Sequence, residues 1–575
     1  MSRPAPEAPT PGGPAWPMAT PQPVPDDSTL KRLIATLREQ APAAIGLWAA
    51  PDPARGSHDA DDWRGARPGP IALAIPASNP TTHSTGNPTP HAADDPTSLD
   101  TTFAIDPDDH LDLTLLLRWL AEPDAPYVVT HGAQITMHRL LTWAPNDDAP
   151  IPARLGCTRV AAVLLTEGAR RGTPTLSDCV ARALDRPWPL RDSEPLLAET
   201  SDTVAAATAA SALMPLMRAL TPMLRQRDLT RVFELECRLA PAVVAMERAG
   251  VGVDAAGFQR VVDGWIREQP TATEPERKAR LAKLVSTYGY WPREYISGDR
   301  IHCRLHPLAA DSGRFSCSEP NLQQVPTEHV APGLRACFRA PEGHVLIVAD
   351  YAQIELRVAA HLAPCEALRA VFREGRDPHR ATAATLARRP ESEITARERQ
   401  LAKAVNFGFL FGMGAPRFRE YAKNSYGLEL DMAQAKDARA AFLRTFPGIA
   451  AWHRRVGQLG RGPTAKAITV RTALGRRKRF APDRFSFNAA LNIPVQGTAA
   501  DGFKLAMTRL HPRLRALGGR GILSVHDEYL AEVPAEQGEP ARQLVQQTMR
   551  EAMQEIVTSV PIEVEAAIAR SWAEK

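Results

Sequence analysis

The chain has 575 residues, with 69 Lys and Arg against 65 Asp and Glu, and a formal net charge of +4. This length is sufficient for three or four domains, and the near balance of charge excludes nucleic-acid binding through overall basicity. Seven cysteines, an odd number without paired spacing, predict a reducing cytoplasmic compartment and no zinc site. We find no apolar run of about 18 residues and no signal sequence, and we expect no membrane span.

The N-terminal third shows few regular patterns. Residues 1–27 are rich in Pro, Ala and Thr, which predicts a disordered tail. Acidic residues at 58–62, and Asp106, Asp108 and Asp109, stand among Gly, Pro and Asp residues and predict solvated loops. Neither segment indicates a chemistry by itself.

The next part of the chain has helical spacing. Residues 229–249 predict a long amphipathic helix kinked at Pro241, with Gly250 at the C′ position. Residues 276–288 predict a second helix with apolar and basic faces. Its apolar face comprises Leu281, Leu284, Val285 and Tyr288, and its basic residues are Arg277, Lys278, Arg280 and Lys283. The basic residues fit the backbone of a nucleic-acid duplex, and equally a solvated surface.

Two segments far apart in the sequence each end an apolar run on an aspartate. VLIVADYAQIELR (345–357) contains Asp350, and ILSVHDEYLAEV (522–533) contains Asp527. Both runs predict buried strands, and residues 529–533 predict the returning strand of a hairpin. Carboxylates on the rims of neighbouring strands can bridge two Mg²⁺ ions roughly 3.5–4 Å apart, an arrangement that serves phosphoryl transfer. Taken singly, each aspartate is equally typical of a turn or a helix N-cap.

A third segment, ARERQLAKAVNFGFLFGMG (396–414), predicts a helix. Arg399, Lys403, Phe407 and Phe411 recur every four residues and would share one face. Two cations followed by two aromatic rings suit the phosphates, sugar and base of a nucleoside triphosphate. An ordinary amphipathic helix with a basic end and an aromatic end explains the same pattern.

These three segments resemble motifs A, B and C of the family A DNA polymerases, the bacterial DNA polymerase I group. The motifs are DYAQIELR at 350–357, R-x3-K-x3-F-G at 399–408 and VHDE at 525–528. Further matching runs are SGRFSCSEPNLQQVP, GRDPHRATAA, LGRRKRFAPD and LNIPVQGTAAD. The likeness extends from about residue 300 to residue 575, and several long motifs in the family's order make it specific.

The resemblance implies a role for each matching residue. Asp350 and Asp527, with the Tyr351 carbonyl, would hold two Mg²⁺ ions, for which Mn²⁺ can substitute, and Lys403 would assist the departing pyrophosphate. The residues implied to bind the dNTP are Arg399 and His379 at the phosphates, Phe407 at the sugar, Glu355 against a 2′-hydroxyl, and Phe411, Gln353 and Ile354. The residues implied to bind primer-template DNA are Arg314, Gln323, Asn492, Gln496 and His526.

Two positions and one region depart from the family pattern. Phe411 stands where bacterial relatives usually have Tyr, and Asn488 stands where Arg is common. Only residues 255–313 separate the GVGVD turn from Arg314, which leaves room for a stub and one helix pair in the thumb.

The region before the thumb resembles a 3′–5′ exonuclease domain. GPIALAIPASNP (69–80) resembles its first strand, and later elements are matched at 101–109, 128–141 and 199–210. Active members end the first strand with Asp-x-Glu, which two-metal hydrolysis requires. In this chain those places fall on Ala74 and Pro76, Thr136 replaces a further Asp, and only Asp202 remains of the acidic set. We therefore expect a retained scaffold without proofreading chemistry.

The resemblance implies an α+β fold, a right-hand polymerase with palm, fingers and short thumb, preceded by an RNase H-like α/β exonuclease-type domain. The expected boundaries are the tail 1–27, the exonuclease-like domain 28–210, the thumb 211–310, the palm 311–365 and 481–575, and the fingers 366–480. The expected activity is DNA synthesis from dNTPs on primer-template DNA by a monomer. The alternatives are an inactive DNA-binding subunit, a single-subunit RNA polymerase that Glu355 disfavours, a nuclease, and a polymerase that retains exonuclease activity.

Overall fold

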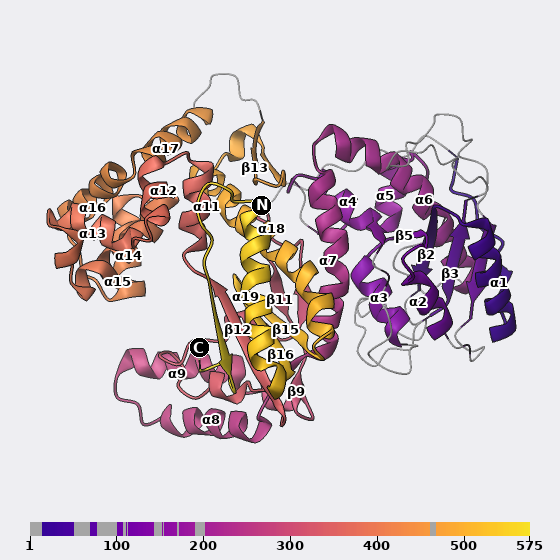
Figure 1. Ribbon diagram of the computed structural model, residues 1–575, viewed down its shortest axis with the longest axis horizontal. Helices are drawn as coiled ribbons and strands as arrows, with labels where there is room; N and C mark the ends of the chain where they lie inside the picture. Colours follow the sequence, from indigo (N-terminus) through magenta and orange to yellow (C-terminus); the bar gives the residue numbers. More distant parts are fainter. Residues whose placement is uncertain are drawn as a thin grey trace. The chain divides into compact units, whose positions relative to one another are not determined.

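The computed structural model describes residues 14–50, 69–76, 101–106, 111, 113–142, 152, 154–169, 172–189, 202–460 and 467–574. The chain forms two compact units, Met1–Val244 and Ala245–Lys575 (Figure 1). Our expectations for residues 1–13, 58–62, Asp108 and Asp109 fall outside the described residues.

Unit 1 contains a mixed sheet whose described strands follow the order β1-β4-β3-β2-β5-β6. β2, β3 and β4 form an antiparallel meander, and β5 and β6 extend it in parallel from β2. The strands are β1 (Gln22–Pro23), β2 (Ala44–Ala49), β3 (Ile71–Ile75), β4 (Thr101–Ile105), β5 (Tyr127–Thr130) and β6 (Leu155–Cys157). The helices are α1 (Asp27–Gln40), α2 (Thr114–Leu120), α3 (Ala133–Thr142), α4 (Thr158–Leu165), α5 (Leu176–Ala183) and α6 (Asp202–Gln226).

Helix α6 packs across β2, β3 and β4 through small side chains. Ala206 and Ala210 are buried against Ala74, and a Cβ on Gly46 would lie 2.7 Å from the Ala210 carbonyl oxygen. Glycine therefore permits the close approach of helix and strand. Among the described helices, α6 is the one long and apolar enough to cross a membrane, contrary to the expectation of no such apolar run. Its most apolar window is 61% buried inside the fold, as in the core helix of a globular unit.

The strand order corrects one expectation about this unit. Residues 71–75 form the second strand of the meander rather than its first, because β2 precedes them and lies between β3 and β5. Both runs are short and apolar, so their composition does not distinguish them. The first strand of the meander ends at Ala49, followed by Ala50, and Ala74 belongs to its neighbour.

The expected disordered tail is wrong for residues 14–27. Trp16 is buried, its indole N–H donates to the Ser211 hydroxyl at 3.2 Å, and its backbone N–H donates to the Pro187 carbonyl at 2.9 Å. Ala19 is buried as well, and its N–H donates to Thr208 at 3.0 Å. One aromatic anchor in a Pro- and Ala-rich segment is therefore sufficient to order it, and composition alone does not register that anchor.

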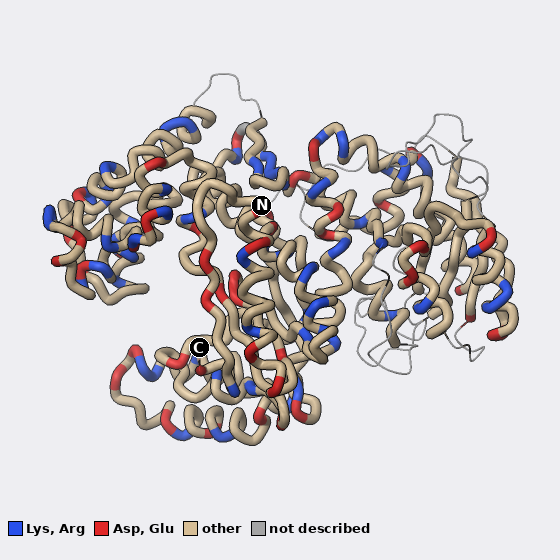
Figure 2. The backbone as a smooth tube through the Cα atoms, viewed as in Figure 1, with Lys and Arg blue, Asp and Glu red and all other residues tan. Residues whose placement is uncertain are grey.

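Unit 2 begins within α7 (Thr230–Ala249), which contains Pro241 and is followed by Gly250 at a φ of 60°. The next helices, α8 (Ala255–Glu268) and α9 (Pro275–Tyr288), pack on each other and agree with the predicted single helix pair. Figure 2 shows Lys and Arg interspersed with Asp and Glu along this pair. The short strand β7 (Val251–Gly252) precedes this pair. The short elements that follow the pair are α10 (Trp291–Glu294), β8 (Ile296–Ser297), β9 (Arg300–Ile301), β10 (Arg304–His306) and β11 (Ser316–Ser318).

The core of unit 2 is an antiparallel sheet in the order β15-β16-β12-β17, against which α18 and α19 pack (Figure 1). The strands are β12 (His344–Tyr351), β15 (Arg520–Val525), β16 (Glu528–Pro534) and β17 (Val564–Ala569). The helices are α18 (Phe487–Arg515) and α19 (Gly538–Gln554). The predicted strands and hairpin are therefore present.

A second group of helices lies to one side of this sheet (Figure 1). Within it, α13 and α14 pack on each other and on α16. The helices are α11 (Ile354–Leu362), α12 (Glu366–Arg373), α13 (Pro378–Ala387), α14 (Ala396–Leu410), α15 (Ala415–Tyr426), α16 (Met432–Thr445) and α17 (Pro447–Leu459). A hairpin of β13 (Ile468–Arg471) and β14 (Arg477–Phe480) joins the group to α18.

Candidate active site

The two aspartates singled out in the sequence lie at one end of the unit 2 sheet. β12 and β16 pair with Asp350 opposite Glu528, and Asp527 stands in the turn just before Glu528. Both motifs contain a residue in left-handed backbone, Gln353 at a φ of 55° and His526 at 58°. Non-glycine residues adopt this conformation rarely, and backbone strain of this kind is enriched at functional sites.

The Asp527 carboxyl group is strongly perturbed. Burial is the main cause that raises its pKa from 3.8 to about 7, and the neighbouring Asp350 carboxylate raises it further. Two negative charges at a partly buried position disfavour each other, so a divalent cation between them would relieve the repulsion. No group of three or more His, Cys, Asp or Glu side chains in the described part of the chain is arranged to hold a metal. This donor set fits Mg²⁺, which commonly takes one or two carboxylates and completes its shell with water and substrate phosphates.

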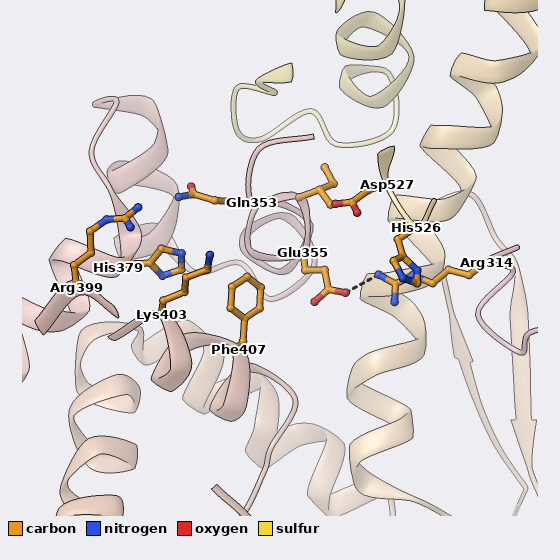
Figure 3. Close-up of a pocket in the computed structure, with 10 residues that line it drawn as sticks. Arg314, Gln353, Glu355, His379, Arg399, Lys403, Phe407, His526 and Asp527 are labelled. Carbon is orange, nitrogen blue, oxygen red and sulfur yellow. Dashed lines mark hydrogen bonds and ion pairs between the residues drawn. The ribbon is translucent and has the colours of Figure 1, made fainter. Parts of the chain in front are cut away.

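A pocket of about 440 Å³ lies between this end of the sheet and helices α13 and α14 (Figure 3). All of its lining residues belong to the set predicted from the sequence. They are Arg314, Gln353, Ile354, Glu355, His379, Arg399, Lys403, Phe407, His526 and Asp527. Segments separated by more than a hundred residues therefore converge on one cavity.

Helix α14 supplies one wall of the pocket. It begins at a capping box in which Thr395 and Glu398 bond reciprocally, and this fixes the start of the helix. Arg399, Lys403 and Phe407 follow at intervals of four residues and all reach the pocket, as the spacing predicted. Cations and an aromatic ring thus face the side of the pocket that carries Asp527.

Asp377 ties the two pocket helices together. It is the N-cap of α13, where its Oδ1 accepts the backbone N–H of His379 at 2.8 Å. Its Oδ2 accepts a hydrogen bond from Arg399 Nε at 2.5 Å. Burial opposes ionisation of this carboxyl group, but the Arg399 and His379 hydrogen bonds outweigh it and lower the pKa. The arginine is therefore held in place before any ligand binds.

His379 lies beside these cations and is itself almost fully buried. Burial lowers its pKa to about 4, against the raising effect of Asp377, and the charges of Arg399 and Lys403 lower it further. Its ring centroid lies 5.8 Å from that of Phe407. At neutral pH the pocket therefore contains a neutral imidazole next to two permanent cations.

Glu355 stands in the middle of the pocket and is held from the opposite side. Its Oε1 accepts a hydrogen bond from Arg314 Nη2 at 2.7 Å (Figure 3). The same oxygen accepts a second hydrogen bond from Gln496 Nε2 at 3.3 Å. His526 lies close by, and burial together with the Arg314 charge lowers its pKa. These contacts fix the direction of the Glu355 carboxylate.

Six predicted site residues do not line this pocket: Asp350, Tyr351, Gln323, Phe411, Asn492 and Gln496. The Tyr351 hydroxyl donates to the Met549 carbonyl at 2.8 Å, and the Gln323 amide donates to the Ser524 carbonyl at 3.0 Å. Asn492 lies on α18 one turn before Gln496. Phe411 is the C-cap of α14, one residue past the end of the helix.

The position of Phe411 departs from the predicted helical face. Because α14 ends at Leu410, the four-residue spacing stops at Phe407, and Phe411 lies outside the pocket lining. Its carbonyl accepts a hydrogen bond from Asn488 Nδ2 at 2.6 Å. The two departures from the family pattern are thus neighbours in space.

Sequence reasoning missed two polar residues of the site, Asp377 and Asn406. Asp377 precedes Pro378, and an Asp followed by Pro at the first helical position is a strong helix-start signal. Asn406 is an amide within an otherwise apolar turn of α14 and is completely buried. Both lie inside motifs that the sequence analysis quoted, where the helix-start signal could have found Asp377 and the lone amide among apolar residues could have found Asn406.

Comparisons with known proteins show which proteins the chain is similar to. The chain is 38% identical to the thermostable DNA polymerase I of Thermus filiformis over 61% of this chain and 42% of that protein. It is 35% identical to the DNA polymerase I of Aquifex aeolicus over 49% of this chain and 47% of that protein. The chain thus spans less than half the length of these curated relatives.

A solved structure shows the same fold over nearly the whole chain. It is the POL domain of Pol1 from M. smegmatis, in complex with DNA primer-template and dNTP, with a TM-score of 0.74 and 24% identity. The match covers 94% of this chain and 98% of that chain, so the right-hand polymerase fold is confirmed. The family model for DNA polymerase family A matches residues 259–574, more than half of the sequence. The chain belongs to DNA polymerase family A.

Proposed function

We propose that the chain catalyses template-directed DNA synthesis, adding dNTPs to the 3′ end of a primer with release of pyrophosphate. The observation that carries the proposal is a single pocket in which Asp527, beside Asp350, faces Arg399, Lys403 and Phe407. Carboxylates on one wall suit divalent cations, and cations on the other suit a triphosphate. The DNA polymerase I relatives and the family assignment point to the same reaction.

Asp350 and Asp527, with the carbonyl of Tyr351, would hold two Mg²⁺ ions or Mn²⁺ in their place. When bound, such ions activate the attacking hydroxyl and neutralise charge on the leaving group. The raised pKa of Asp527 supports this assignment, because the two carboxylates are costly to ionise together in the absence of a cation. Asp350 and Asp527 would also orient the primer end toward the α-phosphate.

The triphosphate would occupy the wall formed by α13 and α14. Arg399 and His379 would bind the phosphates, and Lys403 would donate a proton or charge to the departing pyrophosphate. Before nucleotide binds, Arg399 donates a hydrogen bond to the Asp377 carboxylate. The phosphates would therefore replace Asp377 as its partner or bind Arg399 alongside it. Positioning and charge stabilisation of this kind account for most of the catalysis of phosphoryl transfer.

The sugar and the base pair would lie between α14 and the sheet. Phe407 would pack on the sugar, with Gln353 and Ile354 beside it, and the fixed carboxylate of Glu355 would exclude a 2′-hydroxyl. Phe411, at the end of α14, would contribute to the base-pair side of this site. The residues proposed to contact primer-template DNA are Arg314, Gln323, Asn492, Gln496 and His526.

Unit 1 would serve as a scaffold without proofreading activity. The first strand of its meander ends at Ala49, followed by Ala50. Thr136, in place of an expected Asp, shares a 2.8 Å hydrogen bond with the Thr130 hydroxyl. Ala50 and Ala74 pack in an apolar cluster with Ala19 of the N-terminal segment. Small apolar side chains supply no ligands for metal ions.

The same proposal assigns the parts of the chain. The exonuclease-like domain corresponds to residues 28–210, the thumb to 211–310, the palm to 311–365 and 481–575, and the fingers to 366–480. The sheet that carries Asp350 and Asp527 is then the palm, and the α13–α14 group is the fingers.

Primer extension distinguishes this function from the alternatives. The protein is incubated with Mg²⁺ and a labelled primer-template, together with dNTPs, with rNTPs or with no nucleotide, and EDTA serves as control. We expect extension with dNTPs only, and no primer shortening in any reaction. Equal extension with rNTPs would indicate an RNA polymerase, shortening would indicate a nuclease, and binding without extension would indicate an inactive subunit.

A further inference from the structure

Asn406 connects the two helices of the triphosphate wall. It lies on α14, directly before Phe407, and is completely buried. Its Nδ2 lies 3.1 Å from the Pro378 carbonyl oxygen and 3.0 Å from Nδ1 of His379. Its Oδ1 lies 2.7 Å from the hydroxyl of Thr382, which is buried as well. All four polar groups belong to α14 and the first turns of α13.

The hydrogen-bonding capacities of these groups determine the state of the imidazole ring. A carbonyl oxygen only accepts, so the Asn406 atom that faces Pro378 must be the NH₂ group. The second hydrogen of that NH₂ group then points at His379 Nδ1, which must accept it with a lone pair. The ring proton is consequently on Nε2, the nitrogen on the opposite side of the ring.

The charges around His379 agree with a neutral ring. Arg399 and Lys403 on α14 both disfavour protonation, and Asp377 at the start of α13 favours it. Arg380, the next residue of α13, donates instead to the carbonyls of Glu391 and Ile394. Burial adds to the effect of the two cations, so the ring is a hydrogen-bond donor without a charge of its own.

We propose that Asn406 is a positioning residue of the nucleotide site, which holds His379 with Nδ1 inward and directs the Nε2–H toward the phosphates of a nucleoside triphosphate. This inference rests on the proposed function. Arg399 and Lys403 supply the charge, and the fixed imidazole supplies direction. Because its donor is present in the neutral ring, nucleotide binding through His379 does not depend on pH near neutrality.

The test compares variants of Asn406 by the KM for dNTP, by kcat and by the pH dependence of each. In Asn406→Asp the carboxylate can only accept a hydrogen bond, so Nδ1 of His379 must carry the ring proton. Nε2 of His379 then faces the phosphates without a hydrogen, unless the ring is doubly protonated. For Asn406→Asp we expect a KM near the native value at about pH 6. At about pH 8 we expect its KM to be at least about tenfold higher than the native value, because one charge-assisted hydrogen bond to the phosphates is lost. The native KM is expected to change little over this range. Asn406→Ala should raise KM at both pH values.

Two further variants keep the test decisive if Asn406→Asp misfolds. His379→Gln retains a neutral donor and should keep KM closer to the native value than His379→Ala does. Asn406→Ala should have little additional effect in the His379→Ala background, because it acts through the ring. Thr385→Ala is the matched control. Thr385 lies one turn after Thr382 on α13, and its hydroxyl donates a 3.2 Å hydrogen bond to a backbone carbonyl of the same helix.

Side-chain NMR of the ¹⁵N-histidine-labelled protein gives a readout that is independent of activity. The His379 signal, identified by its loss in His379→Gln, should show the Nε2–H tautomer in the native protein and a change in Asn406→Ala. A native Nδ1–H tautomer, or additive KM effects of the Asn406 and His379 variants, would overturn the proposal. If the native protein extends no primer, the proposed function fails, and the tautomer still decides whether Asn406 orients the ring.

Discussion

Replacing Asp527 by Asn is expected to stabilise the sheet of unit 2 in the absence of divalent cations. Asp527 is partly buried next to Asp350, and this environment raises its pKa from 3.8 to about 7. Asn has nearly the same shape and no charge, so the substitution removes the repulsion between the two carboxylates. The residue that we propose as a metal ligand should thus destabilise the metal-free fold, which is typical of functional sites.

The size and the sign of this effect follow from the pKa. A carboxyl group whose pKa is raised by folding keeps its proton in the folded state while the unfolded chain releases it, so stability falls as pH rises from about 4 to about 7. The rise corresponds to about 4 kcal/mol at about 1.4 kcal/mol per pKa unit. The Asn amide also costs free energy to bury, so part of this 4 kcal/mol is not recovered by the substitution. We therefore expect Asp527→Asn to raise the free energy of unfolding by about 1–3 kcal/mol at about pH 8 and to leave it unchanged at about pH 4.

The assay is urea unfolding in EDTA at both pH values, followed by hydrogen exchange of peptides from β12 and β16. These peptides report on the sheet itself, so independent unfolding of the two units does not confuse the result. Glu565→Gln is the matched control, since Glu565 is exposed on β17 in register with Asp350. Added Mg²⁺ should reduce the difference in stability between Asp527→Asn and the native protein, because it stabilises the native protein alone. An Asp527→Asn variant that is no more stable at the higher pH would refute the reasoning.

Three further predictions concern activity. Mismatched primers should not be shortened by the native protein, and shortening that disappears in Asp202→Ala would show that unit 1 retains nuclease chemistry. Synthesis should be distributive, because α8 and α9 form a single helix pair in the proposed thumb and Arg277 of α9 is already bonded to Glu268 at 2.5 Å. Each missing phosphate contact reduces the salt slope of DNA binding by about 0.9, and long products in a single-encounter assay would contradict this prediction. Glu355→Ala should admit rNTPs, whereas Phe411→Tyr should change rNTP discrimination by about tenfold at most; unchanged exclusion in Glu355→Ala would disprove the gate.

The sequence was most informative where periodicity and chemistry coincide. The apolar runs before Asp350 and Asp527 predicted two strands and a hairpin, and the four-residue spacing from Arg399 to Phe407 predicted one wall of the pocket. Several long motifs in a fixed order then identified the family. These features are local in sequence or depend on motif order, so no knowledge of tertiary packing was needed.

The sequence was least informative where packing decides. The apolar runs of β2 and β3 differ little in composition, and only the strand order shows which of them begins the meander. Trp16 orders its segment because Ser211 lies opposite it, a contact across almost two hundred residues. The hydrogen bonds of Asp377 and Asn406 likewise depend on how α13 meets α14, which no spacing within either helix predicts.

Asp350 and Asp527 are proposed to act together in phosphoryl transfer at one site. The most direct measurement is single-turnover primer extension by Asp350→Ala and Asp527→Ala, with the affinity for primer-template measured on the same preparations. The proposed function predicts that Mg²⁺-dependent extension is abolished in both variants while DNA binding survives, because the ligands for the ions are lost and the other contacts remain. Substantial Mg²⁺-dependent synthesis by either variant would contradict it.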